Sequence, residues 1–147
     1  MSYITNTDIE KRLGSAAYVQ LTDDDGDGVA DAGVVEEARL GAEGEVDSYL
    51  AVRYAVPVDV FAHAELAGLL AATALDLVEY RLRCRRPPAP ADIIRKRCEA
   101  IDWLERVAAG RIDLPAVSPI DVNVTRGPVA STTGAQRVLS RDELSDY

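Results

Sequence analysis

Residues 66–110 read LAGLLAATALDLVEYRLRCRRPPAPADIIRKRCEAIDWLERVAAG, and this stretch decides the fold. Its first half repeats apolar and small side chains at the spacing of one helix face, at Leu66, Leu69, Leu70, Thr73, Leu77 and Tyr80. Its second half does the same at Ile94, Cys98, Ile101, Leu104 and Ala108, and Gly110 follows where a helix stop is expected. Between the halves, Pro87, Pro88 and Pro90 forbid helix continuation. We therefore predict two antiparallel helices joined by a rigid proline turn.

A short helix is predicted near the start of the chain. Thr7-Asp8-Ile9-Glu10 has the Thr-x-x-Glu form of a capping box. Gly14 follows at the place of a left-handed helix stop. The expected helix covers about residues 7–13.

A longer helix is predicted between this helix and the antiparallel pair. Its apolar stripe runs through Val34, Val35, Ala38, Ala42, Val46, Tyr49 and Leu50. Asp31 is a suitable amino-terminal cap, and Pro57 limits the helix at the other end. Gly41 and Gly44 each cost about 1 kcal/mol relative to alanine in a helix interior. They therefore indicate a bend or a close contact with another helix.

The composition agrees with a mainly α fold. Hydrophobic residues make up 48% of the chain, but aromatic residues only 5%, which suits closely packed helices better than a sandwich or barrel. We predict a four-helix connector-type bundle formed by residues 1–114. Residues 115–147 contain three prolines and seven serines and threonines, and they are expected to form an extended C-terminal arm.

A short β-strand is predicted inside this arm. Ile120, Val122 and Val124 alternate with polar residues, which is the two-residue period of a half-buried strand. A lone strand cannot satisfy its own backbone, so we expect it to pair with another segment, which another chain could supply. Fully extended, the arm would reach roughly 100 Å at ~3.3 Å per residue.

Charge is distributed unevenly along the chain. The net charge is −9, and residues 1–50 carry all of it, with twelve acidic and three basic residues. Such a balance argues against non-specific nucleic-acid binding. The opposite charge gathers around the proline turn, where Arg81, Arg83, Arg85 and Arg86 stand close together. This arginine cluster is predicted to form a subunit interface, or else a solvated end of a helix whose dipole favours cations there.

The segment Asp23-Asp24-Asp25-Gly26-Asp27-Gly28 contains Asp-x-Asp-x-Asp-Gly, the opening of an EF-hand-like calcium loop. The ligands predicted from this spacing are Asp23, Asp25, Asp27, the carbonyl of Val29, Asp31 and, as a substitute, Glu36. The twelfth position, where a bidentate glutamate is expected, holds Val34, so only weak calcium binding is predicted. The competing interpretation is a solvated acidic turn that caps the following helix.

Enzymatic constellations are not recognisable in the sequence. His63 is the only histidine and precedes an apolar helix, where it is expected to help start or pack that helix. Cys84 and Cys98 are expected to be reduced, packed thiols. We see no amino-terminal leader and no apolar run near the ~20 residues of a membrane span, so a soluble protein that stays where it is made is expected.

A series of motifs resembles one known family. The matching residues are Tyr3-Ile4-Thr5, then Asp8-Ile9-Glu10-x-Arg12-x-Gly14, Gln20-Leu21-Thr22-Asp23 with Asp25-Gly26-Asp27-Gly28-Val29, Glu45-Val46-Asp47-Ser48-Tyr49-Leu50-x-x-Arg53-Tyr54-x-x-Pro57, and later Asp76, Tyr80 and Ala100-x-x-x-Leu104-x-x-Val107-Ala108-x-Gly110. In this order they resemble a Mu-like phage family first catalogued as a domain of unknown function. The resemblance covers about residues 1–114.

The resemblance implies a non-enzymatic structural protein similar to the head–tail connector adaptors of long-tailed phages. It implies a ring of about a dozen copies beneath the portal, in the neck of a virion or of a gene transfer agent assembled in the bacterial cytoplasm. The expected partners are other copies of the chain, the portal protein and a tail-side neck or stopper protein. DNA would pass through without specific binding, and no membrane is involved. The expected interface residues are Arg81, Arg83, Arg85, Arg86, Ile120, Val122 and Val124.

Two other readings remain open from the sequence. The calcium-like loop alone suggests a stand-alone calcium-binding regulatory module. A tail terminator or another neck protein belongs to the same structural class as the connector, and the sequence does not separate them.

Overall fold

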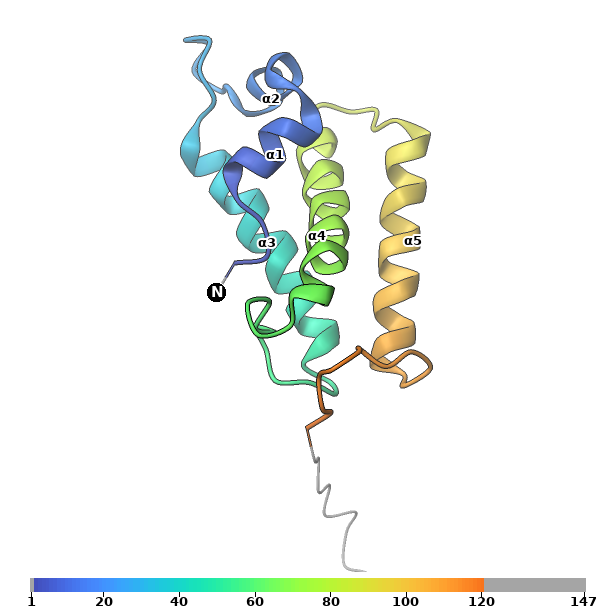
Figure 1. Cartoon of the computed structure of the whole chain (residues 1–147). Coiled ribbons are helices and arrows are strands. Elements are labelled where there is room, and N and C mark those ends of the chain that lie inside the picture. Colours follow the sequence, from blue (N-terminus) through green and yellow to red (C-terminus); the bar gives the residue numbers. More distant parts are fainter. Residues whose placement is uncertain (1, 121–147) are drawn as a thin grey trace, which may run out of the picture.

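The computed structural model of the chain describes residues 2–120, and this part contains five α-helices and no β-strand (Figure 1). The helices are α1 (Asn6–Leu13), α2 (Ser15–Thr22), α3 (Ala32–Leu50), α4 (Ala64–Cys84) and α5 (Ala91–Ala108). The mainly α prediction is confirmed. The predicted strand is not shown: Ile120 is not in a strand, and Val122 and Val124 lie outside the described residues.

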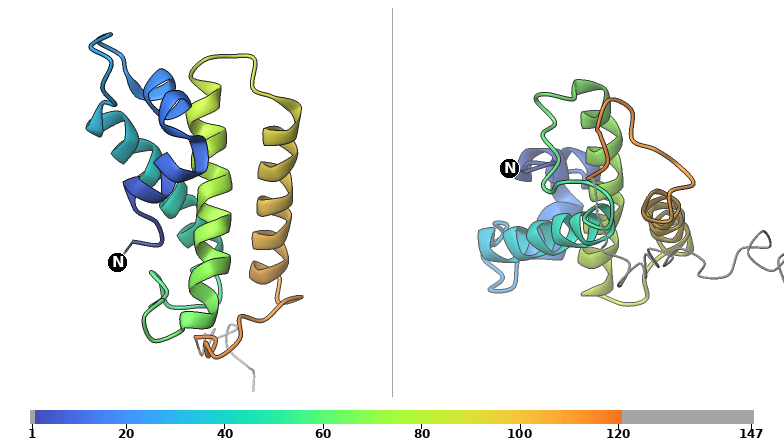
Figure 2. Two further views of the ribbon diagram at one scale, coloured as in Figure 1. Left: turned by 45° about the horizontal axis from the view of Figure 1, so that its top comes forward. Right: turned by 90° about the horizontal axis from the view of Figure 1, so that it is seen from below.

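Three long helices form the body of the molecule, and each of α3, α4 and α5 contacts the other two. The two short helices α1 and α2 contact each other, α3 and α4. They lie on the side of α4 that faces away from α5 (Figure 2, left). Among residues 2–120, none of the helices combines the length and the apolar character that crossing a membrane requires.

The core lies between the three long helices. Its fully buried members are mostly aliphatic and include Val35, Val46, Leu50, Tyr54, Leu66, Leu70, Leu77, Val78, Leu82 and Leu104. Burying one such side chain contributes about 1.5–3 kcal/mol, so this cluster is the main source of stability. The stripe predicted for α3 is confirmed, because Val35, Ala42 and Val46 are buried.

The stripe predicted for α5 was wrong by one residue at its start. Ile93 is buried, whereas Ile94 is 44% exposed and Cys98 is also exposed. A helix turns about 100° per residue, so Ile93 lies only about 20° from the buried Leu104, but Ile94 lies about 80° away. Because two isoleucines are adjacent, the sequence allows either Ile93 or Ile94 to begin the buried stripe. Packing of α5 against α3 and α4 buries Ile93.

Helix α2 was not predicted. Gly14, with φ of +80°, ends α1 and at once begins α2, so no loop separates the two helices. A positive φ of this kind favours glycine. The sequence SAAYVQLT has no single apolar face, and only its last two residues, Leu21 and Thr22, are buried. A search for apolar residues at helical spacing therefore does not identify this helix.

The capping box of α1 exists, but two residues earlier than predicted. Thr5, and not Thr7, is the cap: its hydroxyl accepts from the Asp8 backbone N–H at 3.2 Å. The Asp8 carboxylate in turn accepts from the Thr5 backbone N–H at 2.9 Å. Aspartate thus takes the place that glutamate usually holds in this motif. Arg12, in the last turn, then joins α1 to α4 through an ion pair with Glu79 at 3.1 Å.

Helix α3 begins at the predicted place, with Asp31 as its cap residue. Its side chain makes no capping bond, because it accepts from the Asp24 N–H instead. The helix ends at Leu50, well before Pro57, so Pro57 does not end it. Gly41 confirms a close helix contact, since a Cβ there would lie 2.9 Å from Nη1 of Arg81 on α4.

The chain turns back after α5 and crosses the end of the bundle. Gly110, with φ of +73°, follows the helix end as predicted. The buried Leu114 donates its backbone N–H to the Tyr54 hydroxyl at 3.0 Å. Farther on, the Ile120 N–H donates to the Arg53 carbonyl at 2.6 Å. Residues 111–120 are therefore fixed to the connector between α3 and α4.

Candidate functional site

The aspartate-rich loop joins α2 to α3 and brings three carboxylates together. Side-chain oxygens of Asp23, Asp25 and Asp27 lie within 4.8 Å of one another. Asp23 accepts from the backbone N–H groups of Gly26 at 2.6 Å and Gly28 at 2.9 Å. Both glycines have positive φ, near +80°, which the tight turns of the loop require. These backbone donors lower the pKa of Asp23 below its ordinary value, because they stabilise the ionised carboxylate.

The other predicted ligands have different surroundings. Asp31 accepts from the Asp24 N–H at 2.8 Å, and Glu36 pairs with Arg39 on the next turn of α3. Val34, at the twelfth position, packs against the hydrophobic core. Three of the predicted ligands thus gather, and Glu36 has its own cationic partner. Calcium binding at this loop stays a prediction.

The arginine cluster at the end of α4 reaches over to this loop. Arg85 donates to the Leu21 carbonyl at 2.8 Å and pairs with Asp24 at 2.5 Å. Arg86 donates to the Asp23 carbonyl at 3.1 Å. The sequence suggested a calcium loop and a basic corner as separate features, but the fold makes them neighbours. Arg81 and Arg85 line a shallow surface hollow together with Asp24, Val34, Glu37 and Ala38.

A second set of ion pairs joins the three long helices. Glu45 of α3 pairs with Arg81 of α4 at 2.8 Å and with Arg97 of α5 at 3.2 Å. The Arg97 guanidinium also lies over the Tyr80 ring, 4.8 Å from its centre. Acidic side chains among residues 1–50 thus neutralise, through ion pairs, part of the positive charge around the proline turn. The acidic first fifty residues and the arginine cluster, which are far apart in the sequence, partly neutralise each other within one subunit.

Within residues 2–120, Arg83 has only a long ion pair. Its nearest acidic group, Glu79, lies 4.0 Å away, at the limit of an ion pair. Its Nε is buried and has no hydrogen-bond partner among the described residues.

The start of the chain is held by two carboxylates of α3 that the sequence reading missed. Glu43 is 8% exposed and accepts from the backbone N–H groups of Tyr3 at 2.9 Å and Ile4 at 3.2 Å. The Tyr3 hydroxyl donates to Asp47 at 2.5 Å and accepts from the Val58 N–H at 2.9 Å. Burial raises the pKa values of both Tyr3 and Asp47. The available signal was the spacing of four residues, which places both carboxylates on one face of α3.

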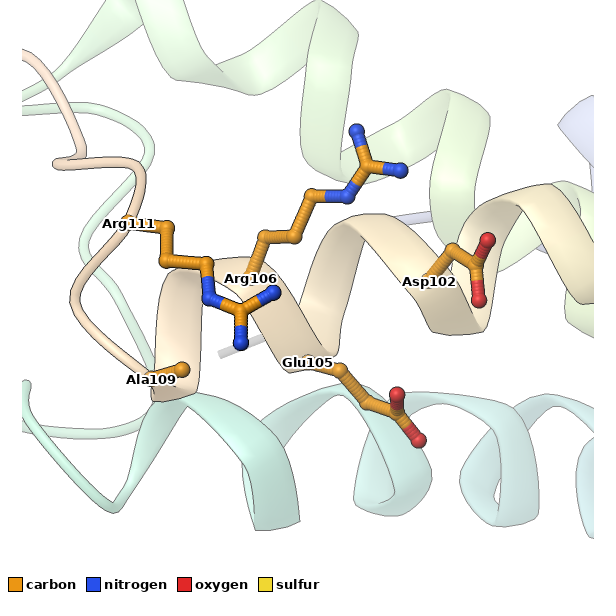
Figure 3. A pocket seen from close by; sticks show the side chains of 5 residues that line it. All are labelled: Asp102, Glu105, Arg106, Ala109 and Arg111. Carbon is orange, nitrogen blue, oxygen red and sulfur yellow. The ribbon is translucent and has the colours of Figure 1, made fainter.

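Another surface hollow lies at the carboxyl end of α5 (Figure 3). Asp102, Glu105, Arg106, Ala109 and Arg111 line it. The charged groups of these residues point in different directions and do not converge on one point (Figure 3).

The chain matches one family model, described as Bacteriophage Mu, Gp36, over residues 3–131. The match spans all five helices and continues beyond residue 114, where the sequence resemblance ended. No curated protein matches the chain.

Proposed function

Because this chain belongs to the Bacteriophage Mu Gp36 family, we propose that it is a structural subunit of the head–tail connector of a tailed phage or phage-like particle. In this proposal, copies of the chain form a ring in the neck of the particle. The ring contacts the portal protein on one side and a tail-side neck or stopper protein on the other. DNA passes through it without specific contacts, and the role is architectural, not catalytic.

The family match carries this proposal. It covers residues 3–131 and therefore includes the whole described helical unit. The motif series of the sequence points to the same class of protein. Family membership supports a phage structural or morphogenesis protein, and the connector role is the more specific step that we propose.

The arginine cluster supports a contact surface on chemical grounds. Arg81 and Arg85 are already fixed by Glu45 and Asp24, so they would lose little conformational freedom when a partner binds. Arg83 and Arg86 lack an ion pair as short as these, and Arg86 is exposed. We propose that Arg83 and Arg86 meet acidic groups of the portal or of a neighbouring copy.

Co-assembly with the portal protein tests this function. Purified full-length chain would be mixed with its portal, and the complex measured by light scattering and negative-stain microscopy. We expect a ring on the portal, and weaker binding for R83E/R86E. The matched control is R106E/R111E, which reverses two arginines at the far end of the molecule and should assemble normally. Failure of the unmodified chain to join the portal would refute the proposal.

A further inference from the structure

The end of the bundle opposite the charged loop exposes large apolar side chains. Phe61 is 84% exposed, Val52 57%, Ile120 45% and Val56 36%. Val52, Val56 and Phe61 belong to the α3–α4 connector, residues 51–63. Ile120 is the last described residue of the segment that follows α5. Both segments are at the same end of the molecule, at the bottom of Figure 1. We call these four residues the apolar end. Three of them belong to one connector, and Ile120 is hydrogen-bonded to that connector at Arg53. Exposed apolar side chains on adjoining segments can mark a surface that something covers.

Charged groups on the two segments that carry the apolar end have partners within the molecule. Arg53 pairs with Asp113 at 2.9 Å and lies over the Tyr54 ring. Asp59 accepts from the backbone N–H groups of Phe61 at 2.9 Å and Ala62 at 3.2 Å. Arg53, Asp59 and Asp113 are therefore engaged within the molecule, and the four exposed side chains of the apolar end suit an apolar partner.

The chain itself brings an apolar segment to this place. The Ile120 N–H is bonded to the Arg53 carbonyl, so the following residues start at the edge of the apolar end. Residues 122–129 read VNVTRGPV, with three valines and a single charge, on Arg126. The family match continues through them to residue 131. The nine residues from 120 to 129 could span about 30 Å when extended, enough to reach any part of this end.

We propose that, in the free subunit, residues 122–129 of the same chain cover the apolar end, with Val122 and Val124 facing it. Tethering favours this occupant, because a segment attached nearby has an effective concentration in the millimolar range, far above that of a second copy in dilute solution. This inference goes beyond the connector function and does not depend on it.

Disulfide trapping in the full-length chain identifies the occupant. In a Cys84→Ser, Cys98→Ser background, Phe61→Cys would be paired with Val124→Cys and oxidised at low protein concentration with oxidised glutathione. We expect an intrachain disulfide that forms roughly tenfold or more faster than in the control pair Val29→Cys and Val124→Cys, whose first position lies in the aspartate-rich loop. Disulfide-linked dimers would assign the surface to a second copy and overturn the proposal. So would equal rates in the two pairs.

A second measurement does not depend on cysteine geometry. The variant V122D/V124D places two carboxylates on the face proposed to cover the apolar end. The matched control N123D/T125D places two carboxylates on the opposite face of the same segment. We expect faster hydrogen exchange in residues 51–63 and stronger binding of an apolar dye for V122D/V124D only. Equal behaviour of the two variants would contradict the proposal, and because neither measurement involves the portal, it would leave the connector function intact.

Discussion

Glu43 shows how one side chain can organise the start of the chain. Its carboxylate accepts from two backbone N–H groups and from the Ser2 hydroxyl, and it lies 3.4 Å from Arg39. A buried charge is tolerated only when it is paired and hydrogen-bonded in this way. Glu43 meets that condition, and the buried Tyr3 and Ile4 are fixed to α3 as a result.

Replacing Glu43 by glutamine should therefore destabilise the fold. The amide keeps one acceptor but loses the charge that strengthens the bonds to Tyr3, Ile4 and Arg39. We expect a loss of about 1–3 kcal/mol in the free energy of unfolding, measured by urea denaturation. The control is Glu37→Gln, an exposed position on the same helix, which should change stability by less than about 0.5 kcal/mol. Equal effects of the two would show that Glu43 has no special role.

The capping box of α1 should give stability a measurable pH dependence. Hydrogen bonds from Thr5 lower the pKa of Asp8 below its ordinary value of 3.8. A carboxyl group with a lowered folded-state pKa contributes stability above its unfolded pKa and loses it as the pH falls through the folded one. Asp8→Asn should cost about 1 kcal/mol at pH 7, and the difference should vanish in acid below the lowered pKa. A difference that persists in strong acid would contradict this account, and Glu10→Gln on the same helix is the control.

At the scale of elements, the sequence predicted four of the five described helices. Long helices with clear stripes, such as α3 and α4, were found because burial imposes a period on the sequence. Helix α2 escaped because its apolar residues do not share a face, and the face of α5 was misplaced because Ile93 and Ile94 both fit a stripe. The Thr5 cap was missed because Thr7 with Glu10 matched the usual motif better than Thr5 with Asp8. Which isoleucine is buried and which threonine caps the helix depend on tertiary packing, and local sequence patterns do not determine that packing.

The two glycines of α3 allow a matched test of helix packing. A Cβ at Gly44 would meet no atom within 4 Å, whereas one at Gly41 would press on the Arg81 guanidinium. Gly44→Ala should therefore stabilise the protein by about 0.5–1 kcal/mol through helix propensity alone. Gly41→Ala should gain less, because Arg81 must move away from Glu45. Thermal unfolding of the two variants would show the difference, and an equal gain would mean that Arg81 adapts freely.

At the scale of the whole molecule, the contacts between distant segments could not be predicted. Arg85 meets Asp24 across about sixty positions of sequence, and nothing local links them. The sequence located the aspartate-rich loop and the arginine cluster correctly as chemical features. Only the fold shows that they partly neutralise each other, and that Glu43 and Asp47 belong to a site at all.

Removing residues 121–147 should separate folding from assembly. The five helices and their core lie within residues 2–120, so the truncated chain should keep its helical circular dichroism and a cooperative thermal transition. Under the proposed connector function, its attachment to the portal should be strongly reduced, because the segment predicted to pair with another chain is missing; co-sedimentation measures this. The result that counts against this view is loss of the folded helices, because residues 121–147 would then belong to the core.

The contrast between the two ends of the bundle gives the subunit a direction. At one extremity the aspartate-rich loop and the arginine cluster are joined by an ion pair and hydrogen bonds, and at the other four large apolar side chains are exposed. A closed circle of copies standing side by side would inherit this asymmetry as two unlike rims. A component that binds one rim would not bind the other, so it could attach to such a ring in only one orientation.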